Sequence, residues 1–208
     1  MNLWIITVNF GDTELTESLI DSLSSLSQAN SIKVAIADNS STDESFFHLK
    51  RIANNTKLDV KIFSNTENIY YWPAAKKLIE NLKKEIGSLP DWIIVCNNDI
   101  TFPNRNFINQ LAKIDINKYP IVGPNIINSY GKKLNPFMIS PYSKIQNIYW
   151  KLYFFSYISS KIFFVIRKLI NLFLLKTKSK NEDVVKKVYA IHGSAILFSN
   201  YFFSKGGW

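Results

Sequence analysis

Three short polar clusters follow apolar runs of the sequence, and their side chains have the chemistry to hold a nucleotide and a metal ion. The clusters are Thr7-Val8-Asn9, Asp38-Asn39-Ser40 and Asn97-Asn98-Asp99. At the end of a buried strand, Asp38 can accept hydrogen bonds from the N–H groups of a nucleobase or from ribose hydroxyls. Asp, Asn and Ser are also ordinary turn residues, so each cluster by itself equally indicates a turn or a helix cap. The three together favour a ligand site.

The third cluster is the candidate metal site. Asp99 offers a hard oxygen ligand of the kind that Mg²⁺ and Mn²⁺ prefer. Asn97 and Asn98 add only neutral amide groups beside it. A bound cation would therefore take its other ligands from a substrate diphosphate and from water. We expect little metal affinity in the absence of nucleotide.

Histidine and cysteine contribute little further chemistry. His192 lies near the last predicted strand and is a candidate base or diphosphate contact, although a lone histidine is more often a packed, hydrogen-bonded residue. His48 falls on a predicted helix with no partner pattern. Cys96 ends an apolar run and is predicted to be a small buried hydrophobe. No Cys/His spacing of the kind that binds zinc occurs in the sequence.

The elements that must position these clusters alternate along the chain. Apolar, β-branched runs predict strands at residues 3–8, 32–37, 60–63, 92–96, 121–123 and 188–198. Apolar residues at helical spacing predict helices between them, with the apolar positions Leu15, Leu19, Leu23 and Leu26, then Phe46, Phe47, Leu49 and Ile52, then Ala74, Ala75, Leu78, Ile79, Leu82 and Ile86, and then Phe107 to Leu111. This order predicts an α/β fold with an open, mostly parallel sheet, helices on both faces and a Rossmann-like nucleotide-binding half. In such a sheet the ligand binds outside the carboxyl ends of the strands.

Length and composition are those of a globular protein. The 208 residues, 47% of them hydrophobic, suffice for one domain over residues 1–208. The single cysteine cannot form an intrachain disulfide, and no signal segment opens the chain, so a cytoplasmic location is expected.

A basic aromatic insertion is predicted at residues 142–180. Between Ile116 and Asn181 the sequence has eleven Lys and Arg and no Asp or Glu, although the net charge of the whole chain is only +9. Cations interrupt every apolar run before a membrane span is reached. The insertion either rests on an anionic membrane surface or packs on the body with its lysines in water. Its many aliphatic side chains argue against nucleic acid as a partner.

Four segments of the sequence resemble the family 2 glycosyltransferases, which have the GT-A fold, and in particular their rhamnosyltransferase-like branch. They are Ile6-Thr7-Val8-Asn9-Phe10, Ala37-Asp38-Asn39-Ser40-Ser41-Thr42-Asp43, Val95-Cys96-Asn97-Asn98-Asp99-Ile100 and Ile191-His192-Gly193-Ser194-Ala195. The resemblance extends over nearly the whole chain except residues from about 136 to 185. It implies a bacterial enzyme of polysaccharide biosynthesis.

The resemblance also implies an activity and a set of binding residues. An inverting enzyme would move a sugar from a nucleotide-diphosphate sugar, with UDP- or dTDP-sugars favoured, to a cell-surface glycan or a polyprenyl-linked acceptor. Asp99 resembles the last carboxylate of the family's Asp-x-Asp metal motif, with Asn97 at the first position. The residues that would bind the nucleotide sugar are Thr7, Val8, Asn9, Asp38, Asn39, Ser40, Asn68, Asn97 and Asn98. The enzyme would act at the inner face of the cell membrane as a peripheral protein.

The sequence departs from the family pattern in two places. Relatives carry glycines and a second asparagine where this chain has Tyr70, Pro73 and Lys76. Relatives also continue beyond the position of Trp208 into an Asp-Glu pair and a carboxylate that acts as general base, so this base is expected to be absent and His192 is a weak substitute. General-base help is worth about 10²–10⁴-fold. The alternative is therefore a truncated or non-catalytic module that binds a nucleotide sugar or docks on a membrane.

Overall fold

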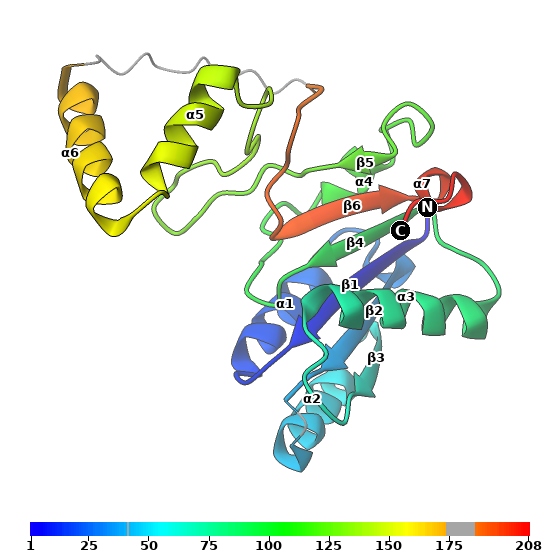
Figure 1. Ribbon diagram of the computed structural model, residues 1–208. Coiled ribbons are helices and arrows are strands. Elements are labelled where there is room, and N and C mark those ends of the chain that lie inside the picture. The colour runs from blue at the N-terminus through cyan, green and yellow to red at the C-terminus, as the bar shows by residue number, and fades with distance from the viewer. Residues whose placement is uncertain (41, 174–185) are drawn as a thin grey trace. The chain divides into compact units, whose positions relative to one another are not determined.

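A six-stranded sheet, in the order β3-β2-β1-β4-β6-β5, forms the centre of the computed structural model, which describes residues 1–40, 42–173 and 186–208 (Figure 1). Strands β1 to β4 are parallel, β6 runs antiparallel to β4, and β5 runs antiparallel to β6. The expected α/β fold with a mostly parallel sheet is confirmed. The strands are β1 (Leu3–Asn9), β2 (Ile32–Asp38), β3 (Asp59–Ser64), β4 (Trp92–Cys96), β5 (Ile121–Val122) and β6 (Ala195–Ser199).

Helices cover both faces of the sheet, as the sequence predicts. Alternate residues of each strand point to opposite faces. Leu3 and Ile5 of β1 belong to a core shared with α1 (Glu14–Ser24), α2 (Asp43–Asn55) and α4 (Phe107–Leu111). Trp4 and Ile6 belong to a second core, built with α3 (Tyr71–Ile86) and with α7 (Asn200–Ser204). Because β1 is buried on both sides, it has no polar face.

Two sequence predictions about these elements are wrong. Leu15, placed on the buried face of the first helix, is 43% exposed, whereas Thr16 is buried. Leu19, Leu23 and Leu26 are buried as predicted, and only the first position of the stripe differs, because the hydroxyl of Thr16 has partners in the interior and can therefore be buried. The last strand begins at Ala195, not at residue 188, because β4 ends at Cys96 and offers no edge beyond the Cys96–Ala195 pair.

Polar residues fix the helix starts that follow the strands. The Oγ1 atom of Thr42 accepts a hydrogen bond from the backbone N–H of Ser45 (3.3 Å) and caps α2. At α1 the carboxylate of Asp12 accepts from the backbone N–H of Glu14 (2.8 Å). Thr42 is thus a side-chain cap of α2, whereas the N-cap residue of α1, Thr13, makes no side-chain capping hydrogen bond and Asp12 holds the turn before the helix. A short 3₁₀ helix, η1 (Ala29–Ser31), which the sequence did not predict, leads into β2.

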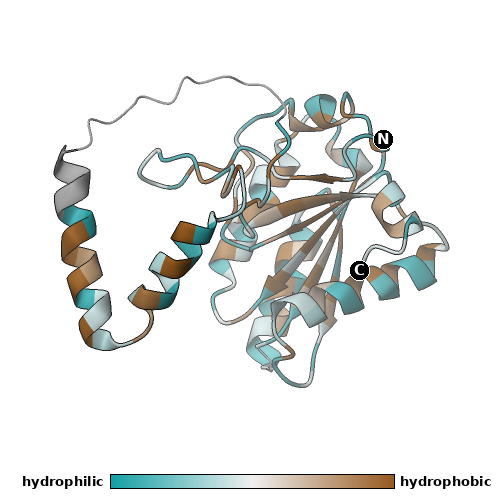
Figure 2. Ribbon diagram, turned by 45° about the horizontal axis from the view of Figure 1, so that its top comes forward, coloured by the Kyte–Doolittle hydropathy of each residue, from teal (hydrophilic) through white to brown (hydrophobic). Residues whose placement is uncertain are grey.

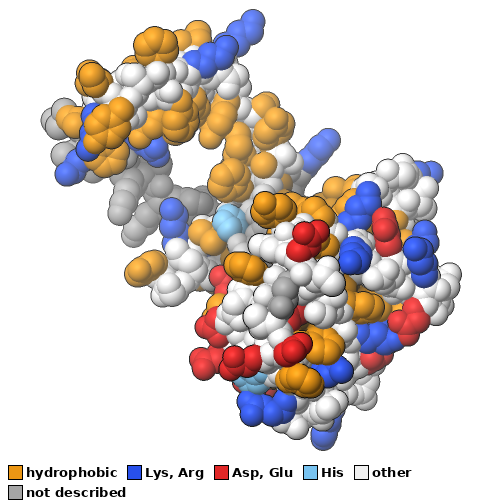
Figure 3. Space-filling view, turned by 60° about the horizontal axis from the view of Figure 1, so that its bottom comes forward, with side chains coloured by type: hydrophobic (Ala, Val, Ile, Leu, Met, Phe, Trp, Pro, Cys, Tyr) orange, Lys and Arg blue, Asp and Glu red, His pale blue; other side chains and the backbone are white. Residues whose placement is uncertain are grey.

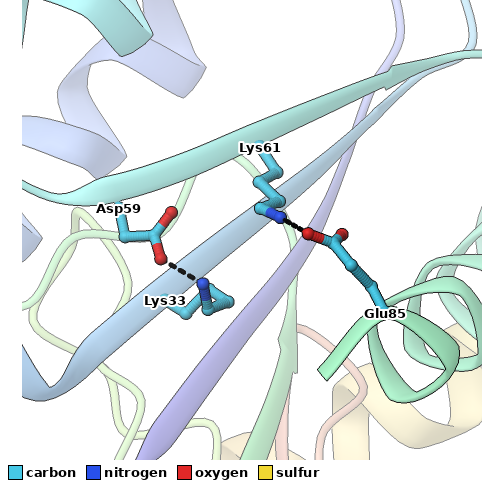
Figure 4. Close-up of polar contacts among 4 residues, drawn as sticks. All are labelled: Lys33, Asp59, Lys61 and Glu85. Carbon is cyan, nitrogen blue, oxygen red and sulfur yellow. Dashed lines mark hydrogen bonds and ion pairs between the residues drawn. The ribbon is translucent and has the colours of Figure 1, made fainter. Parts of the chain in front are cut away.

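Two ion pairs tie the β3 edge of the sheet to its neighbours (Figure 4). Lys33 of β2 pairs with Asp59 of β3, and Lys61 of β3 pairs with Glu85 of α3. All four side chains are partly exposed, so each pair contributes at most about 1 kcal/mol to stability.

The chain divides into two compact units. Residues Met1–Pro136 and Ile191–Trp208 form the sheet unit, and Phe137–Ala190 form the helical unit. The helical unit contains α5 (Lys144–Tyr153) and α6 (Tyr157–Phe173), so the predicted insertion is helical where it is described, while its last residues, 174–180, lie outside the described ranges. Over the described residues, no helix combines the length and the apolar character that crossing a membrane requires.

Candidate functional site

The strand register brings the first two polar clusters together. Asn9 and Asp38 are the last residues of β1 and β2, and they lie opposite each other in the sheet. The backbone N–H of Asn39 donates to the carbonyl oxygen of Asn9 (2.8 Å), and that of Asn65 donates to the carbonyl oxygen of Asp38 (2.9 Å). The chain is thus fixed just where β1, β2 and β3 end.

Asp38 is fully buried, and only one of its two carboxylate oxygens has hydrogen-bond partners. Its Oδ1 atom accepts hydrogen bonds from Ser45 Oγ (3.0 Å), the Ser40 backbone N–H (3.1 Å) and Asn9 Nδ2 (3.3 Å). Its Oδ2 atom is buried and has no hydrogen-bond partner among the residues that the structure describes. The same holds for the hydroxyl of Thr7, two residues before the end of β1. A buried acceptor without a partner is costly unless a ligand supplies a donor.

The third cluster joins this network through Asn98. Asn9 Oδ1 accepts from Thr16 Oγ1 (2.9 Å) and from Asn98 Nδ2 (3.4 Å). The Nδ2 atom of Asn98 also lies 3.1 Å from Thr16 Oγ1. The three clusters therefore meet at the carboxyl ends of β1, β2 and β4, as expected from their positions in the sequence. Their roles in binding stay predictions.

Asn39 belongs to a second polar network. Its Nδ2 atom donates to Asn68 Oδ1 (3.1 Å) and to the backbone oxygen of Tyr70 (3.3 Å), and its Oδ1 atom accepts from Asn65 Nδ2 (2.8 Å). Lys77 of α3 donates to Asn65 Oδ1 (2.8 Å). A cavity of about 300 Å³ adjoins this network and is lined by residues of β2, β3 and α3, among them Asn65 and Lys77. The sequence placed Asn39 and Asn68 with Asp38 in one site, whereas the structure gives them separate partners.

Two other predicted residues, Val8 and Ser40, act in different ways. The side chain of Val8 packs in the core beneath α3, so only its backbone can reach a ligand. Ser40 Oγ accepts from the backbone N–H of Gly11 (2.7 Å) and holds the two loops after β1 and β2 together. Ser41 lies outside the described residues.

The candidate metal ligand Asp99 is exposed, and its charge acts on two buried groups. Burial, and secondly the carboxylate of Asp99, raise the pKa of the Cys96 thiol to about 12. Burial also raises the pKa of Tyr71 well above its usual range, with smaller contributions from Cys96 and Asp99. The Tyr71 hydroxyl is buried and has no partner among the described residues. Cys96 is a buried member of the core, as predicted.

The donor set around Asp99 fits a cation only if a substrate completes it. Among the described residues, no three His, Cys, Asp or Glu side chains are close enough to hold a metal ion together. The Nδ2 group of Asn98 faces Asn9 and Thr16, so Asn98 is a support for the loop. Asp99 and Asn97 remain as the candidate ligands. This suits Mg²⁺ or Mn²⁺, which use one or two carboxylates together with substrate phosphates and water.

The two histidines are both held by neighbours. The backbone N–H of His192 donates to Asn135 Oδ1 (2.6 Å), and its Nδ1 atom lies 2.9 Å from Ser194 Oγ. The carbonyl oxygen of Ser194 accepts from the Asn97 backbone N–H (2.9 Å), so the His192 segment adjoins the metal motif. His48 shows no partner pattern in the sequence, and in the structure its ring nitrogens contact Thr13 Oγ1 and Arg51.

Tyr70 has a backbone conformation that glycine adopts far more easily. Its φ and ψ angles are 63° and 174°, a region almost restricted to glycine. Its N–H donates to Asn68 Oδ1 (2.9 Å) and its oxygen accepts from Asn39, so the turn is held by hydrogen bonds on both sides. This explains why a glycine is the expected residue here.

Sequence reasoning missed several members of the two networks, namely Thr16, Ser45, Asn65 and Lys77, and it missed the buried, unpartnered hydroxyl of Tyr71. Thr16 and Ser45 lie inside helices, where a polar residue normally faces solvent, and only the interior position of Asn9 and Asp38 explains their burial. Asn65 could have been predicted from the sequence, because it follows a predicted strand just as Asn9, Asn39 and Asn97 do.

Comparison with known proteins identifies the family. The family model described as glycosyl transferase family 2 matches residues 4–173. The chain belongs to glycosyl transferase family 2. The expected resemblance is thereby confirmed, while the rhamnosyltransferase-like branch stays a prediction. No match was found among curated proteins.

Solved structures with the GT-A glycosyltransferase fold are similar to this family member. One is the mannosyltransferase PcManGT from Pyrobaculum calidifontis in complex with GDP-Man and Mn²⁺, with 12% identity and a TM-score of 0.57 over 99% of this chain and 46% of that chain. Another is S. aureus TarS in complex with UDP-GlcNAc, with 17% identity and a TM-score of 0.51 over 68% of this chain and 39% of that chain. The family 2 chain thus spans less than half the length of these structures, and at such identity they show the fold alone.

Proposed function

We propose that this chain binds a nucleotide-diphosphate sugar where β1, β2 and β4 end, and that it serves the transfer of the sugar to an acceptor. One observation carries the proposal. Asp38 presents a buried, charged oxygen, Oδ2, that lacks a donor, at the edge of the sheet where ligands bind in this type of fold. Membership of glycosyl transferase family 2 supports the same activity.

A nucleobase N–H is a suitable donor for Asp38. Asn9, Ser45 and the Ser40 N–H hold Oδ1, which fixes the carboxylate plane and leaves Oδ2 to the ligand. The hydroxyl of Thr7 is a second polar group without a partner in the described residues, and it can bond to the nucleoside as donor or acceptor. Uracil and thymine each present one N–H group that can donate to Oδ2, so UDP- and dTDP-sugars, which the family resemblance favours, fit this position. Asn39, Ser40 and Asn68 shape the loops around this position.

Asp99 and Asn97 would hold the divalent cation, Mg²⁺ or Mn²⁺. When bound, the cation offsets the negative charge of the departing diphosphate. Asn98 keeps the Asn97–Asp99 loop next to Asn9 through its hydrogen bond, so the candidate metal ligands adjoin the residues that would bind the nucleoside. A manganese ion accompanies GDP-Man in the similar PcManGT structure.

Transfer would proceed by one displacement with inversion at the sugar. The acceptor hydroxyl oxygen bonds to the anomeric carbon while the bond from that carbon to the diphosphate oxygen breaks, and the acceptor proton leaves to a base. His192, next to Asn97 through Ser194, is the candidate base in this chain. The acceptor is a cell-surface glycan or a polyprenyl-linked sugar, and the reaction takes place on the cytoplasmic side of a bacterial membrane.

Calorimetric titration of the full chain with UDP, dTDP, GDP and CDP, with and without Mn²⁺, tests the proposal. We expect one nucleotide to bind in the presence of Mn²⁺. The Asp38→Asn variant keeps the acceptor for Ser45 and the Ser40 N–H but replaces Oδ2 by a donor, and its affinity should fall by about 10- to 100-fold, since a hydrogen bond to a charged group contributes about 1.5–3 kcal/mol. The matched control Asp59→Asn, at the opposite end of the strands, should bind as the parent does.

The titration also has a result that would refute the proposal, namely no binding of any nucleotide by a folded chain. Transfer is tested separately. The corresponding nucleotide sugar of the nucleotide that binds is supplied, and release of the nucleoside diphosphate is followed. Binding with release identifies an enzyme. Binding without release identifies a nucleotide-sugar-binding module.

A further inference from the structure

The two helices of the helical unit carry exposed aliphatic stripes. On α5, Ile145, Ile148 and Leu152 recur at helical spacing, and all three are exposed. On α6, Ile158, Ile162 and Val165 do the same. Figure 2 shows hydrophobic and hydrophilic residues alternating around both helices. Isolated exposed hydrophobes are normal in proteins, but continuous stripes of this kind mark an interaction surface.

The turn that joins the helices is also hydrophobic. Phe154 and Phe155 lie between α5 and α6, and they are 74% and 83% exposed. Tyr157, at the start of α6, is exposed beside them. We call Phe154 and Phe155 the tip of the hairpin.

The hairpin does not need these stripes for its own packing. Aromatic rings join α5 to α6, with the centroids of Tyr149 and Phe163 5.2 Å apart. Trp150 stacks on Phe154 at 5.7 Å and meets Tyr153 edge-on at 5.5 Å. A Ser143–Gln146 capping box fixes the start of α5. The two helices thus contact each other through aromatic rings, and the aliphatic stripes stay exposed.

Positive charge accompanies the hydrophobic surface. The cations on the two helices are Lys144, Lys151, Lys161, Arg167 and Lys168, and neither helix contains an Asp or Glu. Figure 3 shows hydrophobic side chains over the hairpin, at the upper left, with Lys and Arg at its margins. Lys161 lies over the ring of Tyr157, 5.3 Å from its centroid. Exposed aliphatic side chains, interfacial aromatics and cations without acidic partners are the combination that binds an anionic lipid surface.

We propose that the α5–α6 hairpin docks in the plane of an anionic lipid bilayer, with the Phe154–Phe155 tip and the aliphatic stripes in the acyl boundary and the lysines among the headgroups. A lipid surface satisfies both features of the hairpin at once, since it offers an apolar layer beneath a negative one. A second copy of the chain fits less well, because it would bring two basic surfaces together. The proposal goes beyond nucleotide-sugar binding and does not depend on it.

Flotation of the full chain with lipid vesicles tests this surface. Vesicles of equal parts phosphatidylcholine and phosphatidylglycerol should bind the chain, phosphatidylcholine vesicles should bind it far less, and added salt should weaken binding. The double variant Lys161→Gln/Lys168→Gln should lower the partition coefficient by about 25-fold, at about fivefold per charge removed. The double variant Phe154→Ser/Phe155→Ser should lower it by about tenfold or more.

Two variants of the sheet unit serve as matched controls. Lys83→Gln/Lys84→Gln removes two exposed charges from α3, and Phe47→Ser removes an exposed ring from α2. Both should bind vesicles as the parent chain does. Thermal unfolding of every variant shows that the fold is kept.

Three results would overturn the inference. The chain could fail to bind anionic vesicles, or bind neutral ones equally well. The parent chain could bind no vesicles while the tip variant has a lower melting temperature than the parent. This result would show that other residues of the protein cover the hydrophobic surface. The chain could form dimers that the tip variant dissociates, which would identify a second copy as the occupant. Nucleotide titration of the same samples keeps these outcomes apart from a failure of the proposed function.

Discussion

At the scale of single residues, the candidate site depends on where adjacent side chains point. Asp38 and Asn39 are neighbours in sequence, yet Asp38 bonds to Ser45 of α2, whereas Asn39 bonds to Asn65 and Asn68 in the loop before α3. Successive residues of an extended chain point to opposite sides. The two residues therefore serve two networks, of which only the first contains the unpartnered carboxylate oxygen.

The proposed metal ligand gives one prediction at this scale. Because Asp99 is exposed, Asp99→Asn should leave the melting temperature unchanged while removing a ligand charge. We expect nucleotide affinity measured with Mn²⁺ to fall to the value measured without it. Calorimetric titration checks this, with the exposed Glu67→Gln in a neighbouring loop as control. Unchanged Mn²⁺ dependence in Asp99→Asn would assign the cation to other residues.

Cys96 gives a second prediction, on the dependence of stability on pH. Its pKa rises from 9.0 to about 12 on folding, so between these pH values the folded state holds a proton that the unfolded state has lost. The contribution of Cys96 to the free energy of unfolding should therefore be fully present below pH 9. It should decrease as the pH rises towards 12, by at most about 1.4 kcal/mol per pH unit.

Urea unfolding at a series of pH values measures this slope. The Cys96→Ala variant should lose stability less steeply above pH 9 than the parent chain, and Tyr71→Phe should have a similar effect, because burial raises the pKa of Tyr71 as well. If stability fell equally steeply with pH in the parent and in both variants, the raised pKa of Cys96 and Tyr71 would be contradicted.

At the scale of elements, the connection from β3 to α3 contains a strained residue. Tyr70 precedes α3 with a positive φ of 63°, and its side chain is 75% exposed, so the ring contributes little packing. Strain of this kind costs about 1–3 kcal/mol. The backbone bonds to Asn68 and Asn39 hold the turn in place despite that cost.

We expect Tyr70→Gly to stabilise the chain by about 1 kcal/mol, because the relief of strain exceeds the roughly 0.5–1 kcal/mol entropy cost of glycine. Chemical denaturation measures the change. Tyr130→Gly is the control, since Tyr130 is even more exposed and lacks a positive φ. It should be neutral or destabilising. Equal effects of both substitutions would show that Tyr70 is not strained.

At the scale of the whole molecule, the helical unit is inserted between two neighbouring points of the chain. Within the sheet unit, the backbone N–H of His192 bonds to Asn135, so the chain leaves and re-enters close together. Within the helical unit, Met138 and Ala190 form an antiparallel bridge with N–O distances of 3.0 Å in both directions. A pair of this kind can be joined by a two-residue turn.

Replacing residues 139–189 by Asn-Gly should therefore leave the sheet unit folded. We expect a cooperative thermal transition within a few degrees of the parent, unchanged nucleotide affinity, and loss of binding to anionic vesicles. Circular dichroism, calorimetry and flotation measure the three properties. An unfolded product would show that the sheet unit needs the helical unit for its stability.

The sequence alone determined the class of fold, the positions of most strands and helices, and the three polar clusters. It could do so because strand burial, helix periodicity and turn chemistry are local properties of the chain. The run Leu3 to Val8 is apolar at every position but Thr7, which only a strand buried on both sides explains well, and the Asn and Asp residues after β1, β2 and β4 stand out against their apolar neighbours.

Only the tertiary structure decided how those residues meet. The register of β1 and β2 places Asn9 opposite Asp38, and a slip of one residue would turn every side chain to the other face. Thr16 is buried in place of Leu15 because Asn9 and Asn98 satisfy its hydroxyl, and Asn98 lies 82 residues away in sequence. His48 likewise finds its partner Thr13 across 35 residues. Such contacts follow from packing between elements, and no local pattern of the chain encodes them.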